Sequence, residues 1–353
     1  METFLQQLVN GISQGSAYAL IALGYTMVYG VLRLINFAHA DVYMFGAFMG
    51  FYIANNRWIK GTLGDSALSA VVVLLGAMAL SAALGILIER FAYRPGRGRS
   101  RYAIAFWLGI AGAATGQIIN GSVAAWLAGA AIGVAIGVIA DKVGLRPAQE
   151  NSRLALLIIA IGLSLFLENG GQQVFGADPK FFPQIIPTRL IDIGPLHIDS
   201  QKLIVLGVSV VLMVLLTIIV NYTKTGKAMR AVSFNIDAAK LMGIDTDRII
   251  AFTFALGSAL AAAAGILVSL LYPKIDPLMG VMPGLKAFVA AVLGGIGNIP
   301  GAMIGGLILG MAEVMAVGYG ESTYRDAIAF IILVLILLLK PTGIMGKGMT
   351  EKV

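Results

Sequence analysis

Few side chains in this sequence could do catalytic chemistry. Histidine occurs only at positions 39 and 197, and the 353-residue chain contains no cysteine. The sequence has no HExxH motif, no G-x-S-x-G nucleophile motif and no histidines at metal-ligand spacing. Gly226-Lys227 lacks the upstream glycine of a P-loop and is followed by Ala228. We therefore expect no enzymatic activity, no cofactor and no bound metal, and any ATP that drives this protein must bind to another polypeptide.

A polar group lies at the front of the chain, where Asn36, His39 and Asp41 stand near the start of an apolar run. Polar side chains at such a place have two interpretations. They can cap and hold a discontinuous helix, or they can lie on the path of a transported solute. The second histidine, His197, lies in a proline- and glycine-rich stretch and is expected to be inert.

A stretch near the back of the chain, residues 294–310, contains too much glycine to form a uniform helix. Non-helical backbone at membrane depth persists only where protein covers it or where it borders a wet cavity. Many transporters place such breaks at corresponding positions of two halves, beside the substrate. We therefore expect the front and back breaks to contribute to a translocation path. The candidates at the back are Gly294, Gly295, Gly297 and Asn298.

One intramembrane ion pair follows from spacing. Lys286 precedes Ile299 by 13 residues and Glu313 follows it by 14. If both runs are helical, the two charges lie at the same depth, about 20 Å from the turn. A lone charge there is costly, so we expect the two to pair, either structurally or as a gate. For an isolated pair, exchanging the two charges should partly restore a protein that either single alanine substitution impairs.

The composition indicates which elements hold these residues. Charged residues make up 12% of the chain, about half the share of a soluble domain, and the mean hydropathy is +0.88. We predict an all-α polytopic transmembrane helical bundle of about 11 spans including half-helices, with residues 1–353 as a single transmembrane domain. The expected runs are Ile12–Leu32, Phe37–Ile53, Leu68–Ile88, Tyr102–Ile119, Val123–Ala140, Leu154–Leu167, Lys202–Val220, Ile249–Leu271, Gly284–Gly297, Gly301–Val317 and Ala327–Leu339.

Basic loops set the expected orientation, because lysine and arginine gather on the cytoplasmic side of a membrane. Residues 89–101 and Asn221–Arg248 are the basic loops, which places the N-terminus outside and the C-terminus inside. Gly170–Gln201, rich in proline and glycine, is then an extracytoplasmic loop. No lysine or arginine precedes Arg33, so we expect no secretory signal peptide. These loops account for the net charge of +7, and we expect no nucleic-acid partner.

Within Asn221–Arg248, the residues Phe234–Leu241 are predicted to form a short helix that Gly243 can end. A small, partly polar helix between two spans is suited to docking into a soluble partner. The alternative is a solvated loop whose charges only set the orientation.

Several stretches resemble the branched-chain amino acid ABC importer permeases of the LivH type. They are GISQGSAYALIALGYTMVYGVLRLINFAHADVYMFGAF (11–48), ERFAYRP (89–95), RAVSFNIDAAKLMGI (230–244), LKAFVAAVLGGIGNIPGAMIGG (285–306) and YRDAIAFIILVLILLLKPTGIMG (324–346). The resemblance implies a permease subunit of the bacterial inner membrane that pairs with a second, LivM-like permease. It also implies two cytoplasmic ATPase subunits, which bind the ATP, and a periplasmic or lipid-anchored substrate-binding protein.

The resemblance also implies a role for the short helix. Asp237, Ala238 and Ala239, followed by Gly243, are similar to the motif through which importer permeases contact their ATPases. This sequence has aspartate where the motif usually begins with glutamate, which keeps the carboxylate. Nearby members carry urea or short amides, and the motifs do not separate these substrates. An ion-coupled secondary transporter is the rival class, and it would need a deep carboxylate, for which Glu313 is the candidate.

Residues 101–145 depart from the family pattern. Members usually run from a YRP element directly into a basic stretch and the next span. Here Tyr93-Arg94-Pro95 is followed by two further apolar runs before Leu145-Arg146-Pro147 resumes the pattern. We predict an inserted helical hairpin, which preserves the topology on both sides because it adds an even number of spans.

Overall fold

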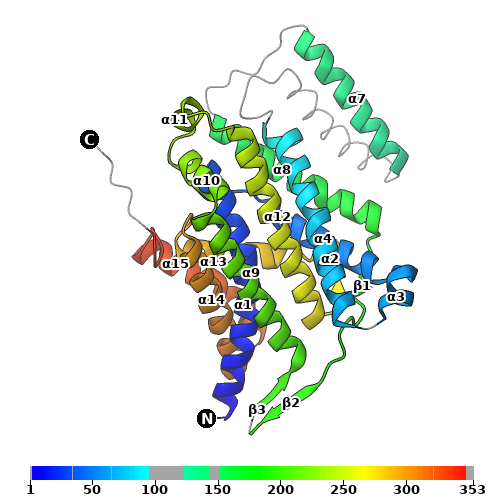
Figure 1. Ribbon diagram of the computed structural model, residues 1–353, viewed down its shortest axis with the longest axis vertical. Helices are drawn as coiled ribbons and strands as arrows, with labels where there is room; N and C mark the ends of the chain where they lie inside the picture. The colour runs from blue at the N-terminus through cyan, green and yellow to red at the C-terminus, as the bar shows by residue number, and fades with distance from the viewer. Residues whose placement is uncertain are drawn as a thin grey trace.

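The computed structural model describes residues 2–33, 35–64, 66–94, 123–142, 152–194, 196–320 and 322–346. Most of these residues are helical (Figure 1). The helices are α1 (Glu2–Leu32), α2 (His39–Ala54), α3 (Arg57–Leu63), α4 (Ala67–Ile88), the π-helix η1 (Glu89–Tyr93), α7 (Val123–Lys142), α8 (Ser152–Phe175), α9 (Ser200–Tyr222), α10 (Lys224–Phe234), α11 (Ile236–Leu241), α12 (Thr246–Leu271), α13 (Val281–Gly294), α14 (Ile299–Tyr319), the 3-10 helix η2 (Ser322–Tyr324) and α15 (Arg325–Leu339). The strands are β1 (Lys180–Phe181), β2 (Leu190–Ile193), β3 (Leu196–Asp199) and β4 (Lys274–Ile275).

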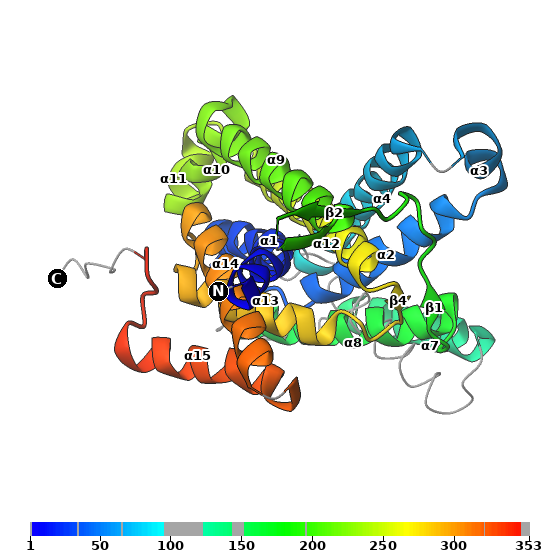
Figure 2. The ribbon, with the colours of Figure 1, turned by 90° about the horizontal axis from the view of Figure 1, so that it is seen from below.

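The central helix is α1, which packs against α14, α12, α13 and α9. Viewed from below, it lies between the α13–α14 pair and the α9–α12 pair (Figure 2). Glycines permit the close approach of α1 and α14. A Cβ on Gly310 would lie 2.3 Å from the Cα of Gly15, and one on Gly306 would lie 2.5 Å from the Cα of Ala19. Small residues at a crossing let two helix backbones pack tightly where lipid supplies no hydrophobic driving force.

A second buried helix, α12, joins the front of the chain to the back. It packs against α4, α1 and α2. A Cβ on Gly46 of α2 would lie 2.3 Å from the Cα of Ala262, and one on Gly85 of α4 would lie 2.2 Å from the hydroxyl oxygen of Ser258. Both crossings therefore depend on glycine, as the one between α1 and α14 does.

The coarse prediction of a helical, polytopic membrane protein is confirmed. Among the described residues, α1, α4 with η1, α9, α12 and α14 are each long and apolar enough to cross a membrane. The faces of α4 and α9 expose large apolar side chains, as lipid-facing helices do. The count of about 11 spans and the orientation stay predictions.

Most helix boundaries differ from the sequence prediction by a few residues, and two differ by eight or more. α1 begins at Glu2, not at Ile12, because polar residues of its first turns bond to other parts of the chain. The Gln6 amide nitrogen donates to the backbone oxygen of His197 at 2.9 Å, and its amide oxygen accepts from the backbone N–H of His197 at 3.1 Å. α8 likewise continues to Phe175, eight residues past the predicted end at Leu167.

The predicted loop Gly170–Gln201 contains strands instead of irregular backbone only. β2 and β3 form an antiparallel hairpin with Ile193 opposite Leu196, and β1 pairs antiparallel with β4. The hairpin and the N-terminal end of α1 lie at one end of the molecule, and α10 and α11 lie at the other (Figure 1).

The predicted insertion, residues 101–145, is described only in part. Its first expected helix, Tyr102–Ile119, lies outside the described residues. Its second expected run, Val123–Ala140, is helical as α7, which lies at the edge of the fold away from α1 in both views (Figures 1 and 2).

The glycine crossing predicts a stability difference between two valine substitutions. Gly306→Val should lower the melting temperature and the monodisperse yield of the purified protein, because overpacking costs about 1–3 kcal/mol. Gly207→Val is the matched control, since nothing lies within 4 Å of a Cβ at that position of α9. Equal melting temperatures for the two variants in detergent would contradict the close approach of α1 and α14.

Candidate functional site

The segment between α9 and α12 contains two short helices, and α10 is the first. The Thr223 hydroxyl oxygen accepts a hydrogen bond from the backbone N–H of Gly226 at 3.0 Å, which starts the helix. α10 then packs against the bundle through Met229 and Val232, both buried. Sequence analysis missed α10, because its basic residues suggested a loop while these two apolar residues, three positions apart, form the buried face.

The second short helix, α11, begins after a capping residue. Asn235 has an extended backbone with φ −156°, and its side chain accepts hydrogen bonds from the N–H groups of Asp237 and Ala238 at 2.9 and 3.0 Å. This cap satisfies two N–H groups that have no partner within the helix. The helix therefore starts two residues later than the predicted start at Phe234.

Gly243 ends α11. It has φ +80°, in the left-handed region that favours glycine. Its N–H donates to the oxygen of Lys240, and the N–H of Ile244 donates to the oxygen of Ala239, each at 3.0 Å. The prediction that Gly243 stops this helix is confirmed, and its physical reason is the left-handed C-terminal cap.

The outer side of α11 and its flanks is apolar and exposed. Phe234, Leu241 and Met242 are 86%, 89% and 82% exposed. The carboxylate of Asp237 is exposed beside them, whereas Ala239 faces the bundle and is buried. Large apolar side chains gathered on an exposed surface mark a site for a partner.

Both ends of this segment are fixed to the long helices. Arg230 donates to the backbone oxygen of Val220 at the end of α9. A Cβ on Gly226 would lie 2.2 Å from that same oxygen, so α10 is pressed against α9. At the other end, α10 and α11 both contact α12, whose Asp247 pairs with Arg94 at 2.7 Å. A displacement of α10 and α11 would therefore reach α9 and α12 through direct contacts.

The front polar group is buried, and its three side chains have separate surroundings. The oxygen of the Asn36 amide accepts a hydrogen bond from the Tyr93 hydroxyl at 2.7 Å, which ties the turn after α1 to η1. Asp41 accepts from the Ser164 hydroxyl at 2.6 Å, which ties α2 to α8. None of the three side chains caps α2, where no side-chain cap hydrogen bond forms.

His39 fills a space that a glycine leaves open. A Cβ on Gly24 would lie 2.2 Å from the imidazole ring, so any other residue at position 24 would displace it. The ring also packs edge-on against Tyr25, with 4.7 Å between the ring centroids. The histidine thus locks the start of α2 onto α1.

The back candidates lie at the end of α13, which is Gly294, and in the turn that follows it, which contains Gly295, Gly297 and Asn298. Gly295 has φ +105° and Gly297 has φ +92°, values that only glycine adopts easily. Asn298 caps α14 by accepting from the N–H of Gly301 at 3.1 Å. Its amide nitrogen donates to the backbone oxygen of Met345 at 2.8 Å, so the segment after α15 covers the turn.

The two breaks lie at the same end of α1. A Cβ on Gly30, near the end of α1, would lie 3.9 Å from the Cα of Gly297. The front turn that contains Asn36 follows α1 by a few residues. The role of either break in a translocation path stays a prediction.

The structure brings Lys286 and Glu313 together and adds two charges to them. Lys286 Nζ lies 2.8 Å from Glu313 Oε1, and both side chains are buried. Arg325 also pairs with Glu313, and Asp326 lies 2.6 Å from Lys286 Nζ. The four charges sum to zero, and the partly exposed Arg325 and Asp326 compensate for the buried Glu313 and Lys286.

A hydrogen-bonded chain continues from this charge cluster along α1. The Tyr18 hydroxyl donates to Glu313 Oε2 at 2.8 Å, and the Gln14 amide nitrogen donates to Tyr18 at 2.9 Å. Sequence analysis missed Tyr18, Gln14 and the charges at the start of α15. Counting residues outward from the Asn298 turn gives the depth of side chains on α13 and α14 only, so it does not find partners on α1 or α15. Among the residues that the structure describes, no three histidine or carboxylate side chains gather in a way that could hold a metal ion.

Comparisons with known proteins agree over almost the whole chain. The family model described as branched-chain amino acid transport system / permease component matches residues 7–118 and 101–337. The high-affinity branched-chain amino acid transport system permease protein LivH of Salmonella typhimurium is 39% identical over 355 residues, which covers 99% of this chain and 98% of LivH. BraD of Pseudomonas aeruginosa, with the same description, is 36% identical over 99% of this chain and 98% of its own length. The ribose import permease protein RbsC of Escherichia coli is 27% identical over 62% of this chain and 67% of its own length. No solved structure matches.

The charge cluster predicts an order of severity for two neutral substitutions. Glu313→Gln should destabilise the protein by about 3 kcal/mol, because it leaves Arg325 and Lys286 without their shared carboxylate. Lys286→Met should cost less, since Glu313 keeps Arg325 as a partner. Thermal unfolding of the two purified variants measures the difference. If Lys286→Met were less stable than Glu313→Gln, the claim that Glu313 is the shared partner of the cluster would be contradicted.

The same cluster revises the expectation for a charge exchange. In the double variant Lys286→Glu with Glu313→Lys, the new lysine lies beside Arg325 and the new glutamate beside Asp326. These two contacts then repel and only the exchanged pair still attracts, so we expect the double variant to be no more stable than Lys286→Ala or Glu313→Ala. Partial recovery in the same unfolding assay would favour the isolated pair that the sequence predicted.

Proposed function

This chain belongs to the family of branched-chain amino acid transport permeases, and from that membership we propose that it is the membrane-spanning subunit of an ATP-driven importer. The proposed cargo is a branched-chain or other hydrophobic amino acid. The importer includes a second, LivM-like permease, two cytoplasmic ATPase subunits that bind the ATP, and a periplasmic or lipid-anchored binding protein. The proposed location is the bacterial inner membrane, with the N-terminus outside and the C-terminus inside.

The observation that carries this proposal is the shape of α11. This capped helix of six residues and its flanks carry exposed apolar side chains, and the helix lies in the segment between the long helices α9 and α12. We propose that Asp237, Ala238, Ala239 and Gly243 form the ATPase-coupling element. ATP binding would move the ATPases, α11 would move with them, and α9 and α12 would shift relative to α1.

The front and back breaks have a supporting role in this proposal. Both lie where α1 ends, and the backbone at each is non-helical, as it is beside the substrate in many transporters. The Lys286–Glu313 pair, in contrast, has structural partners on every side. Glu313 has three partners, so it is poorly suited to bind and release a coupling proton or sodium ion.

We also propose that residues 101–145 are an inserted hairpin within a single permease domain, 1–353. The family model matches this chain in two pieces, residues 7–118 and 101–337. The break between the two pieces falls within 101–145, which supports an insertion there. A variant that lacks 101–145 should therefore keep assembly and leucine uptake near the full-length level. Loss of assembly in that variant would contradict a peripheral insertion.

Uptake in proteoliposomes tests the proposed function. The permease pair, the ATPases and the leucine-loaded binding protein are combined, and ATP is supplied on the ATPase side. Leucine should accumulate with ATP and without any ion gradient. Accumulation driven by a proton or sodium gradient in the absence of ATP would select a secondary transporter instead, and uptake of urea but not leucine would select the amide-carrying branch.

Substitutions on α11 test the coupling element. Leu241→Asp and Asp237→Lys should abolish copurification of the ATPases and reduce ATP-dependent uptake to background, while the permease itself stays folded. Leu190→Asp is the matched control, because Leu190 is 70% exposed but lies on β2 at the opposite end. Normal ATPase binding by both α11 variants would contradict this assignment.

A further inference from the structure

A cavity of about 400 Å³ lies at the end of the bundle opposite α11. It is open on one side and lined by the first half of α1, the start of α9, the end of α12, the end of α14 and the start of α15. Its volume is within the range of small-molecule sites, about 300–1,000 Å³. In the proposed orientation this end faces the binding protein.

One wall of the cavity carries a pair of opposite charges where β3 joins α9. Lys202 Nζ lies 3.2 Å from Asp199 Oδ2 and 3.0 Å from the amide oxygen of Asn10. Both charged side chains are partly exposed to the cavity. A cation and an anion this close can bind a carboxylate and an ammonium group held on one carbon atom.

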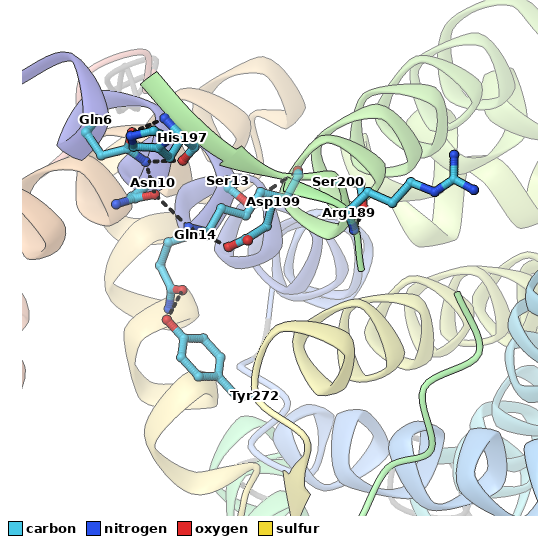
Figure 3. A network of polar contacts seen from close by, with 10 residues as sticks. Gln6, Asn10, Ser13, Gln14, Arg189, His197, Asp199, Ser200 and Tyr272 are labelled. Carbon is cyan, nitrogen blue, oxygen red and sulfur yellow. Dashed lines mark hydrogen bonds and ion pairs between the residues drawn. The ribbon is translucent and has the colours of Figure 1, made fainter. Parts of the chain in front are cut away.

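The floor of the cavity is polar and fixed in place. The Tyr272 hydroxyl donates to Gln14 Oε1 at 3.3 Å, and Figure 3 shows the two side chains meeting. Gln14 in turn contacts Tyr18, and Arg325 pairs with Glu313 beneath. The floor is therefore held by the charge cluster. Three charged side chains line the cavity: Arg325 has its carboxylate partner in that cluster, whereas Lys202 and Asp199 pair with each other at the cavity wall.

The remaining wall is aliphatic. Leu271 of α12 and Val314 and Val317 of α14 line it. A ligand that fits both walls has an α-ammonium, an α-carboxylate and a branched hydrocarbon side chain. Urea has no charged group and no hydrocarbon side chain, so it fits neither wall.

We propose that this cavity is the receiving site for the zwitterion of an aliphatic amino acid. Lys202 holds the carboxylate, Asp199 holds the ammonium group, and the side chain lies against Leu271, Val314 and Val317. This inference rests on the proposed import function, and it adds the site at which the permease itself recognises the cargo.

Cysteine protection in the assembled transporter tests the site. The chain has no natural cysteine, so Val317→Cys places one thiol on this polypeptide, which a membrane-impermeant maleimide can label from the binding-protein side. Leucine at ten times its dissociation constant should slow labelling about tenfold, because about one site in eleven stays free. Isoamylamine, which lacks the carboxylate, isocaproate, which lacks the ammonium group, and urea should each leave the rate unchanged.

Second substitutions identify the charged residues. Adding Lys202→Gln or Asp199→Asn to Val317→Cys should return the labelling rate with leucine to the rate without it. Arg189→Gln is the matched control, because Arg189 is an exposed cation of the same end that does not line the cavity, and leucine should still protect. Leu190→Cys, on exposed β2, should label equally with and without leucine.

The outcomes separate this site from the proposed function. ATP-dependent leucine uptake together with unprotected labelling at both Val317→Cys and Val314→Cys would overturn the site and leave the importer intact. Failure of both thiols to label at all would also overturn it, since the cavity would then be closed to that side. Protection by leucine without any ATP-dependent uptake would support the site and count against the importer.

Discussion

The burial of Glu313 is the constraint on which the rest of this structure depends. Its side chain has 0% exposure, and a charge taken out of water costs several kcal/mol unless partners compensate for it. The partners come from three other helices: Tyr18 of α1, Lys286 of α13 and Arg325 of α15. These helices must therefore stay together at this depth, whatever the rest of the bundle does. The cluster thus fixes the floor of the cavity above it.

Two long helices, α9 and α12, connect that cavity to the proposed ATPase contact. α9 begins beside the cavity and ends at Tyr222, next to α10. α12 begins beside α11 and ends at Leu271, in the cavity wall. At 1.5 Å per residue, they span about 35 and 39 Å. A shift of α11 would therefore act on the cavity through two continuous rods, while the charge cluster holds α13, α14 and α15 in place.

The sequence predicted most of what depends on periodicity and local chemistry. Apolar runs indicated the helices, Gly243 indicated a helix end, and counting from the turn brought Lys286 and Glu313 to one depth. What depends on tertiary contact was missed. α10 required a buried face that only the bundle supplies, and the helical start of α1 required Gln6 to bond with His197. Arg325 could have been suspected, because a charge at the start of the last apolar run needs a partner at membrane depth.

The most direct test of the account is whether nucleotide at the ATPases changes the cavity at the far end. The labelling rate of Val314→Cys is measured in the assembled transporter, without nucleotide and with a non-hydrolysable ATP analogue. The account predicts that the analogue changes the rate, and that Gly243→Trp, which disturbs the end of α11, removes the change. An unchanged rate in a transporter whose ATPases bind the analogue would contradict it.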